Sequence, residues 1–357
     1  MRQTFNDVII LFFVTLCNGF SSCKGQTEFG TNFLHLEKKI PLPDIKGRID
    51  HMDINLKDQV VYVAALGNNT VEAVDLRNSK IIHSIKNLDE PQGIGYIPQN
   101  NEIFVANGGN GDCYFYNARN FEKIAAIHLS SDADDVRYDS AERKIYVGYG
   151  AGGIAIIDAD SHKQTGDIKL PAHPESFQID KKLNLLFVNL PDAHMVAAAD
   201  LNQVKLINKW VRNSPTANFP MALDTIQHRV FIGYRHPVKL VVLDGKPGNE
   251  ISMNTMTGDA DDLYYDYETK EIFVSGGDGH ISIFRQRGKN IYEQIANILT
   301  SSGARTSLFI PQLKLFVVAA RASSGKIANL FVYKIAQHWN GVTGYCRCRD
   351  CLRKSNA

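Results

Sequence analysis

Histidine and carboxylate residues stand close together in several short segments of this sequence. Asp50 and His51 are adjacent in RIDH, His173 and Glu175 flank a proline in HPES, and the tetrapeptide DADD occurs twice. Imidazole and carboxylate groups bind divalent cations, and histidine also transfers protons near neutral pH. These segments would form a metal or acid–base site if the fold brought them together. The first question is therefore which structural elements carry them.

A repeated strand pattern shows how the chain is organised. An aromatic residue recurs inside a short apolar run, as in VVYVAA, EIFVAN and KIYVGY, at intervals of 41 to 44 residues. Chance apolar runs would not keep this interval over most of a chain, so the pattern predicts seven copies of one structural unit. The aromatic positions are Tyr62, Phe104, Tyr146, Phe187, Phe231, Phe273 and Phe316.

Each copy divides into four strand-like runs. In the third copy these are DDVRYD, KIYVGYG, GIAIIDA and KQTGDIKL, which are rich in Val, Ile and Tyr and are separated by turn residues. Seven four-stranded antiparallel blades around an axis form a β-propeller, which is the fold we predict. The last copy has only three runs, and the segment 32–43 resembles the outermost runs of other copies. We therefore predict that this N-terminal strand completes the last blade and that the propeller spans residues 32–335.

The segments that precede the innermost strands, which we call lead-in segments, converge near the axis of such a ring. In the seven copies they read RIDH, EPQG, DADD, HPES, NFPM, DADD and GART. The loops between the second and third strands lie on the same side of the ring and add LPDAH and GYRHP. Together they predict a central funnel lined by Asp50, His51, Gln92, Asp134, Asp135, His173, Glu175, His194, Asn218, Arg235, His236, Asp261, Asp262 and Arg305.

Two kinds of function fit this predicted funnel. It could bind a small polar ligand or a metal ion, or it could be the active site of a metal-assisted lactonase or lyase in which His51, His173, Glu175 and Arg305 take part in the reaction. The candidate metal ligands are His51, His173 and His194, and the ion would be zinc, copper or calcium. Crowded carboxylates should have raised pKa values unless a cation such as Arg305 compensates them.

The same residues also have a purely structural interpretation. An aspartate at the start of a strand often caps a turn or accepts a hydrogen bond from neighbouring backbone. The DADD at 259–262 could then repeat the structural role of the DADD at 132–135. His51 and His173 could be hydrogen-bonded core histidines, and His194 could be an exposed loop residue. The sequence leaves these alternatives open.

Charge and motifs exclude several functions. The chain has 39 basic and 38 acidic residues, so its net charge of +1 creates no field that attracts nucleic acid, and a carboxylate-rich funnel would repel a polyanion. No Walker-type phosphate loop and no Gly-x-Ser-x-Gly elbow are present, which argues against nucleotide chemistry and serine hydrolysis. We expect a monomer whose partner is a small polar molecule or an envelope protein.

The strand repeats also point to a known family. Motifs such as KIYVGYG and EIFVANGGNG resemble those of the YVTN-type propellers, and residues 32–335 as a whole resemble the exported YncE-like proteins of bacteria. This resemblance implies an exported β-propeller. It does not imply a particular reaction, because the architecture hosts both enzymes and binding modules.

The N-terminal residues predict export. Residues 1–23 contain the apolar run 8–20, which is too short to span a bilayer and has the length typical of a signal peptide. Two serines precede Cys23, much as small residues precede the lipidated cysteine of bacterial lipoproteins. Cys23 is therefore either a lipid anchor or a residue near a simple cleavage site. The signal peptide would be followed by a linker at 24–31. We expect a bacterial protein of the periplasm or the outer membrane.

The C-terminal residues carry a cysteine motif that the repeat does not explain. Residues 336–357 include Cys346, Cys348 and Cys351 in the segment YCRCRDC. This tail could bind a soft metal ion, form a disulfide in an oxidising compartment or remain unstructured.

Overall fold

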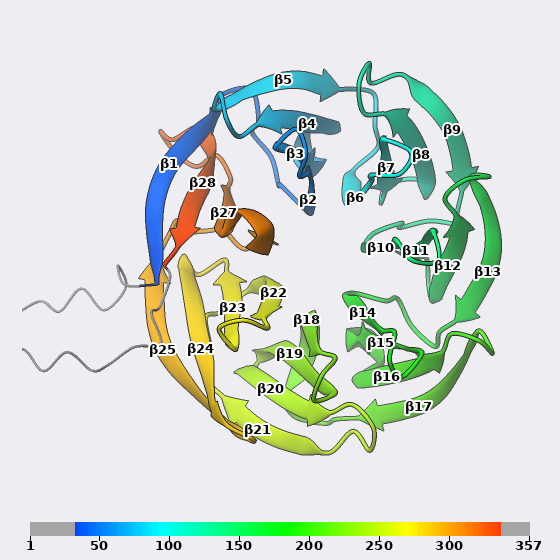
Figure 1. Ribbon diagram of the computed structural model, residues 1–357, viewed down its shortest axis with the longest axis vertical. Coiled ribbons are helices and arrows are strands. Elements are labelled where there is room, and N and C mark those ends of the chain that lie inside the picture. The colour runs from blue at the N-terminus through cyan, green and yellow to red at the C-terminus, as the bar shows by residue number, and fades with distance from the viewer. Residues whose placement is uncertain (1–32, 337–357) are drawn as a thin grey trace, which may run out of the picture.

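Seven four-stranded sheets are arranged around a central axis in the computed structural model, which describes residues 33–336 (Figure 1). Neighbouring strands within each sheet run antiparallel. The predicted seven-bladed β-propeller is therefore confirmed. The signal peptide, the linker, Cys23 and the cysteine motif of the tail lie outside the described residues.

Six blades follow chain order from the innermost strand to the outermost one. Blades one to three comprise β2 (Met52–Asn55), β3 (Val60–Ala65), β4 (Thr70–Asp75) and β5 (Lys80–Ile85); β6 (Pro91–Ile97), β7 (Glu102–Asn107), β8 (Asp112–Asn117) and β9 (Lys123–His128); and β10 (Val136–Asp139), β11 (Lys144–Tyr149), β12 (Gly153–Asp158) and β13 (Lys163–Lys169). Blades four to six comprise β14 (Phe177–Asp180), β15 (Leu185–Leu190), β16 (Met195–Asp200) and β17 (Lys205–Val211); β18 (Thr216–Asp224), β19 (Arg229–His236), β20 (Val238–Asp244) and β21 (Glu250–Asn254); and β22 (Ala260–Asp266), β23 (Glu271–Gly276), β24 (His280–Gly288) and β25 (Ile291–Leu299).

The seventh blade combines the two ends of the described chain. It comprises β26 (Ser307–Ile310), β27 (Leu315–Ala320), β28 (Ala328–Ile335) and, outermost, the N-terminal strand β1 (Leu34–Leu42). In this pairing Leu34 lies opposite Ile335 and Leu42 opposite Ala328. The prediction that the N-terminal strand completes the last blade is confirmed, and this pairing closes the ring by hydrogen bonds.

The repeated aromatic residues form the packing between blades. All seven are buried, with at most 1% of their surface exposed, and each lies on the second strand of its blade. Tyr62, for example, packs in one apolar cluster with Ile94 and Ile103 of the next blade. Burial of such side chains stabilises the fold by about 1.5–3 kcal/mol each, so the repeat interval follows from the need to fill every gap between blades.

Helices are nearly absent from the described residues. They comprise three short 3₁₀ turns, Leu66–Asn68, Pro191–Ala193 and Pro311–Leu313. Between residues 33 and 336 no helix has the length and apolar character needed to cross a membrane. The inner strands β2, β6, β10, β14, β18, β22 and β26 surround the axis, and they and the lead-in segments before them carry most side chains near it (Figure 1).

Candidate functional site

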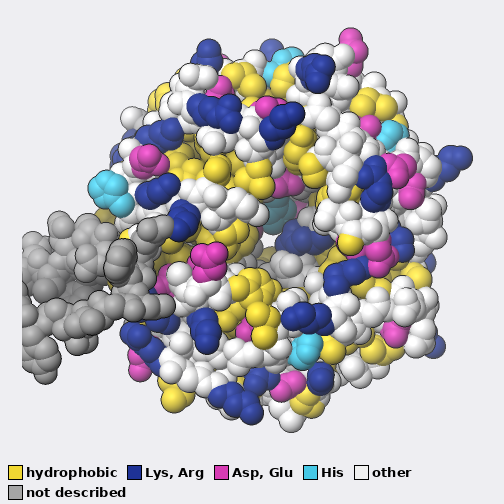
Figure 2. All heavy atoms as spheres, viewed as in Figure 1, with side chains coloured by type: hydrophobic (Ala, Val, Ile, Leu, Met, Phe, Trp, Pro, Cys, Tyr) yellow, Lys and Arg dark blue, Asp and Glu magenta, His cyan; other side chains and the backbone are white. Residues whose placement is uncertain are grey.

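The lead-in segments meet in a polar funnel at one end of the central axis. This cavity has a volume of about 300 Å³, and charged or polar side chains line almost all of it. The lining residues are Arg48, Asp50, His51, Gln92, Asp132, Asp134, His173, Glu175, Ser176, Phe219, Arg235, Asp261 and Arg305. Figure 2 shows one face of the molecule, where the ring has a central hollow bordered largely by hydrophobic side chains, with charged side chains deeper inside.

Most of the predicted funnel residues lie in this cavity. The structure brings together Asp50, His51, Gln92, Asp134, His173, Glu175, Arg235, Asp261 and Arg305. Sequence reasoning missed Arg48, Asp132, Ser176 and Phe219, although each belongs to a lead-in segment that was recognised. The segments were thus the right signal, and the choice of residues within them was too narrow.

Three predicted residues do not line the funnel. Asn218 is 1% exposed, and its amide donates hydrogen bonds to Asn189 Oδ1 at 3.0 Å and to the Met195 carbonyl at 2.9 Å. His194 is exposed at the end of the turn Pro191–Ala193, and His236 is exposed at the end of β19. Asn218 fills a structural position because its donors bond backbone and a neighbouring amide. Neither of the two histidines lines the funnel.

Asp135 and Asp262 also sit outside the funnel and bond the next blade. Asp135 Oδ2 accepts a hydrogen bond from the Phe177 amide at 3.1 Å, and Asp262 Oδ2 accepts one from the Ser307 amide at 2.7 Å. Both carboxylates line a second cavity at the opposite end of the axis. Each of them directly follows an aspartate that lines the funnel, Asp134 or Asp261. Successive side chains of extended backbone point to opposite sides, so Asp135 and Asp262 point away from the funnel.

His51 stands at the floor of the funnel among carboxylates. Its Nε2 lies 3.6 Å from Asp134 Oδ1 and 3.8 Å from Asp50 Oδ1, and its Nδ1 lies 3.7 Å from Asp262 Oδ1. One ligand atom each from Asp50, His51 and Asp134 fall within 4.8 Å of one another, a spacing that could hold a metal ion. The predicted metal ligands were His51, His173 and His194. In the structure the cluster around His51 contains two carboxylates instead, because His194 does not line the funnel and His173 is not part of the cluster.

Asp134 is the least satisfied group of this cluster. Its Oδ1 is buried and has no hydrogen-bond partner among the described residues. Burial raises the pKa of Asp134 well above its usual range, and the nearby charges of Asp50, Glu175 and Asp135 add to this effect while His51 opposes it. A buried acceptor without a partner is costly, so this oxygen is the group in the funnel that a bound cation or donor would stabilise most.

For His51, unlike Asp134, nearby charges outweigh burial in setting the pKa. Burial alone would lower the pKa of His51, but the carboxylates of Asp50, Asp262, Asp134 and Asp135 outweigh burial and raise it to about 10. His51 is thus an imidazolium at neutral pH unless a metal ion displaces its proton. The sequence predicted that crowding would raise the pKa values of the carboxylates. The pKa values of Asp134, Glu175 and Asp262 are raised, and burial is the largest cause for each.

Three arginines line the funnel, and all of them are already paired: Arg48 lies 2.9 Å from Asp50 Oδ2, and the other two contact aspartates of the sixth blade. Arg305 Nε lies 2.5 Å from Asp261 Oδ2, and its Nη1 lies 3.2 Å from Asp259 Oδ1. Arg235 forms an ion pair with Asp261, donates two hydrogen bonds to the Ala260 carbonyl and lies over the Phe219 ring at 3.6 Å. These contacts hold the guanidinium groups of Arg305 and Arg235 in fixed positions beside Asp261, whereas Asp134 Oδ1 faces His51 at 3.6 Å.

Glu175 and His173 form the remaining titratable pair. Burial raises the pKa of Glu175 to about 7, although the charges of His173, Arg235 and His51 lower it. The Nδ1 atom of His173 donates a hydrogen bond to the Gly150 carbonyl at 2.7 Å, which orients its ring and leaves Nε2 free of that bond. A carboxyl group that titrates near neutral pH can accept and release a proton under ordinary conditions.

Comparisons with known proteins agree with the fold and go no further. No family model and no curated protein matches the chain. Among solved structures, it is similar to the hydrazine synthase of Kuenenia stuttgartiensis, with a TM-score of 0.71, 13% identity, and coverage of 85% of this chain and 98% of that chain. It is also similar to a chain of the mitotic checkpoint complex, with a TM-score of 0.72, 15% identity, and coverage of 93% and 100%. At such identities the likeness shows the β-propeller fold alone.

Proposed function

We propose that this propeller is a binding protein whose funnel holds a divalent cation at Asp50, His51 and Asp134 and presents it to a small polar ligand. The observation that carries the proposal is the buried Oδ1 of Asp134, which has no hydrogen-bond partner within residues 33–336 and lies 3.6 Å from His51 Nε2. One imidazole and two carboxylates that leave a position open to the funnel suit zinc best, with calcium and copper as alternatives. Arg305 and Arg235 would orient an anionic part of the ligand.

The test is zinc binding to the full chain, purified without added metal or a histidine tag. We expect about one equivalent of zinc by mass spectrometry, and Asp134→Asn should weaken zinc binding by about 100-fold because one charged ligand is lost. Asp192→Asn, in an exposed loop, is the matched control. Failure of zinc, calcium and copper to bind the unaltered chain, or equal affinity in Asp134→Asn, would sink the cation site.

A second candidate function is supported by Glu175. A carboxyl group whose pKa is raised to about 7 lies in the same funnel as the proposed cation site, which is an arrangement suited to a general base in metal-assisted lactone hydrolysis or a lyase reaction. In this alternative the cation polarises a carbonyl and Glu175 moves the proton. Turnover of any lactone that Glu175→Gln abolishes while zinc still binds would favour this enzyme, and turnover that Glu175→Gln leaves intact would exclude Glu175 as its base.

We also propose that the protein is an exported, YncE-like protein of the bacterial periplasm or outer membrane. The apolar run 8–20, the serines before Cys23 and the YVTN-type strand motifs support this assignment. Cell fractionation tests it: a lipid anchor predicts that Cys23→Ala moves the protein from the membrane fraction to the soluble one. An unprocessed chain in the cytoplasm would contradict export.

A further inference from the structure

The central channel has a second cavity, which meets the funnel at His51, Ser176 and Asp261. It lies at the other end of the axis from the funnel, where the inner strands end, and has a volume of about 710 Å³. This is within the range of about 300–1,000 Å³ that is usual for small-molecule sites. Its walls are largely apolar and include Ile54, Ile94, Val136, Met221, Leu263 and Leu308.

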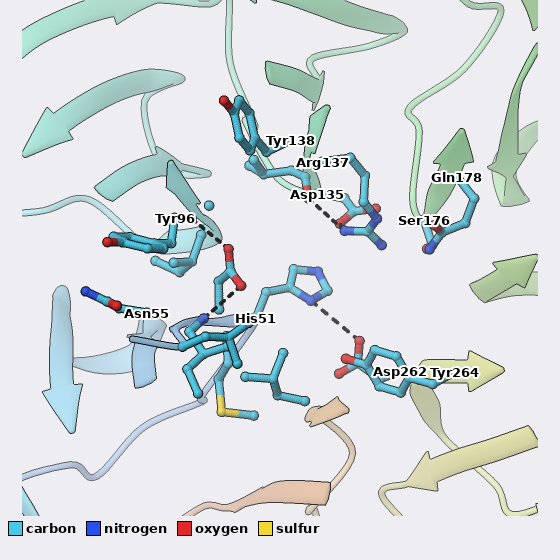
Figure 3. A pocket seen from close by; sticks show the side chains of 18 of the residues that line it. His51, Asn55, Tyr96, Asp135, Arg137, Tyr138, Ser176, Gln178, Asp262 and Tyr264 are labelled. Atoms are coloured by element: carbon cyan, nitrogen blue, oxygen red, sulfur yellow. Dashed lines mark hydrogen bonds and ion pairs between the residues drawn. The ribbon is translucent and has the colours of Figure 1, made fainter. Parts of the chain in front are cut away.

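Strand register places a few polar side chains among these apolar walls. Asp53, Arg137, Gln178 and Tyr264 each lie directly opposite the repeated aromatic of their blade, so they occupy equivalent positions on four inner strands. All four line the cavity. In Figure 3, Arg137 and His51 point into it, with Tyr96 on one side and Tyr264 on the other. A few convergent polar groups in an apolar cavity are typical of a ligand site.

Several acceptors of this cavity already accept hydrogen bonds from the protein. Asp53 accepts hydrogen bonds from the Tyr96 amide at 2.6 Å and the Ile54 amide at 2.7 Å. Asp262 accepts one from the Ser307 amide, and the Tyr264 hydroxyl donates to the Ser307 carbonyl at 2.7 Å. These acceptors therefore favour no hydrogen-bond donor on a ligand.

Only the Nη1 group of the Arg137 guanidinium donates hydrogen bonds to the described residues. Its Nη1 donates to Asp135 Oδ1 and, at 2.8 Å, to the Val136 carbonyl. Among the described residues no hydrogen-bond partner is seen for its Nε and Nη2, and 32% of the side chain is exposed. Nε and Nη2 form one edge of the guanidinium group, and their parallel N–H bonds match the two oxygens of a carboxylate.

We propose that this cavity binds a small, mainly apolar molecule that carries a carboxylate at one end. The carboxylate accepts two hydrogen bonds from Nε and Nη2 of Arg137. The apolar body packs against Ile54, Tyr96 and Leu263, and Lys57 at the rim adds a positive charge. The site goes beyond the proposed cation funnel: the two cavities share His51, Ser176 and Asp261, but the carboxylate site extends to the ends of the inner strands and uses a different arginine.

The test compares three probes of one shape with different head groups: 2-naphthoate, 2-naphthamide and 2-naphthylmethylammonium. Ligand-observed NMR titration of the full chain should give saturable naphthoate binding that is about tenfold tighter than naphthamide binding, with the ammonium weakest. Arg137→Gln should reduce the naphthoate affinity about tenfold and change the naphthamide affinity by no more than about threefold. Arg119→Gln, at an exposed position, controls for the substitution itself.

A second pair of variants tests the charge at the rim with little risk to folding. Leu56 lines the cavity and is 37% exposed, so a charged side chain fits there. The ratio of naphthoate to naphthamide affinity should rise about threefold in Leu56→Lys and fall about threefold in Leu56→Glu. The proposal is overturned by an absence of saturable binding, by equal affinities for naphthoate and naphthamide, or by a ratio that neither Arg137 nor Leu56 variants change. Loss of naphthoate binding in Arg305→Gln but not in Arg137→Gln would place the probe in the funnel and also overturn it.

Discussion

The two DADD tetrapeptides, at 132–135 and 259–262, have the same sequence and different surroundings. Their alanines are fully buried, and their last aspartates both accept a hydrogen bond from the next blade. The aspartates at the third position, Asp134 and Asp261, differ. Asp261 is paired with two arginines, whereas the buried Oδ1 of Asp134 has no hydrogen-bond partner among the described residues and faces His51.

This difference originates in the neighbouring blades. Arg235 and Arg305 come from the blades on either side of the sixth blade, which carries Asp261. Beside the third blade, the lead-in segments contribute Gln92, which donates to Asp132 at 3.1 Å, and Glu175, which adds another carboxyl group. A motif thus determines where a side chain lies in its blade, and adjacent blades determine whether its charge is compensated.

The largest expected effect tests the fourth position of the motif through pH. Burial raises the pKa of Asp262 from 3.8 to about 7, so the folded state prefers the protonated form. Its contribution to stability is complete below about pH 4 and is lost as the pH rises through 7, a change of roughly 4 kcal/mol. Urea unfolding between pH 4 and 8.5 should show this slope in the unaltered chain.

Asp262→Asn isolates the contribution of this residue to the slope. Asparagine keeps an acceptor for the Ser307 amide and cannot titrate, so the variant should lose less stability with rising pH than the unaltered chain. Glu175, whose pKa is also raised to about 7, keeps part of the slope in both proteins. Asp192→Asn controls for the loss of one acidic side chain. An unchanged slope in Asp262→Asn would show that Asp262 ionises without cost.

The next effect tests whether the aspartates at the fourth position, Asp135 and Asp262, are structurally equivalent. Asp135→Ala and Asp262→Ala each leave a backbone amide of the next blade, Phe177 or Ser307, without its acceptor. An amide left unpaired in this way costs about 1–3 kcal/mol, so both variants should be destabilised by about 2–3 kcal/mol in urea unfolding. Asp135→Ala should be at the upper end, because it also removes the partner of Arg137. A loss confined to one variant would break the equivalence.

The sequence predicted the fold well because it repeats. The aromatic interval and the strand-like segment 32–43 were sufficient for seven blades and their closure, since every gap between blades must be filled in the same way. The site was predicted only as a set of segments. Which residue of DADD faces the funnel depends on strand alternation, and the pairing of Asp261 depends on residues one blade away in each direction.

The cavity at the other end of the axis was not predicted, for a related reason. Its polar residues, Asp53, Arg137, Gln178 and Tyr264, differ in type from blade to blade and lie inside strands rather than in loops. Repeat analysis looks for what the copies share, and these positions share only their register. Comparing the residues that pair with the repeated aromatic residues, copy by copy, would have revealed them.

The smallest effect distinguishes the aspartates at the third position, Asp134 and Asp261. Asp261→Asn removes charge-assisted hydrogen bonds from Arg235 and Arg305, whereas Asp134→Asn removes a charge from a buried oxygen that has no partner. We expect Asp261→Asn to be about 1–2 kcal/mol less stable than Asp134→Asn in metal-free buffer at pH 7, because an arginine–carboxylate bond is worth more than a neutral one. Added zinc should stabilise the unaltered chain and Asp261→Asn, but should stabilise Asp134→Asn much less. Equal stability of the two variants without metal would mean that Asp259 alone compensates both arginines, and the contrast between the two tetrapeptides would then lie in cation binding only.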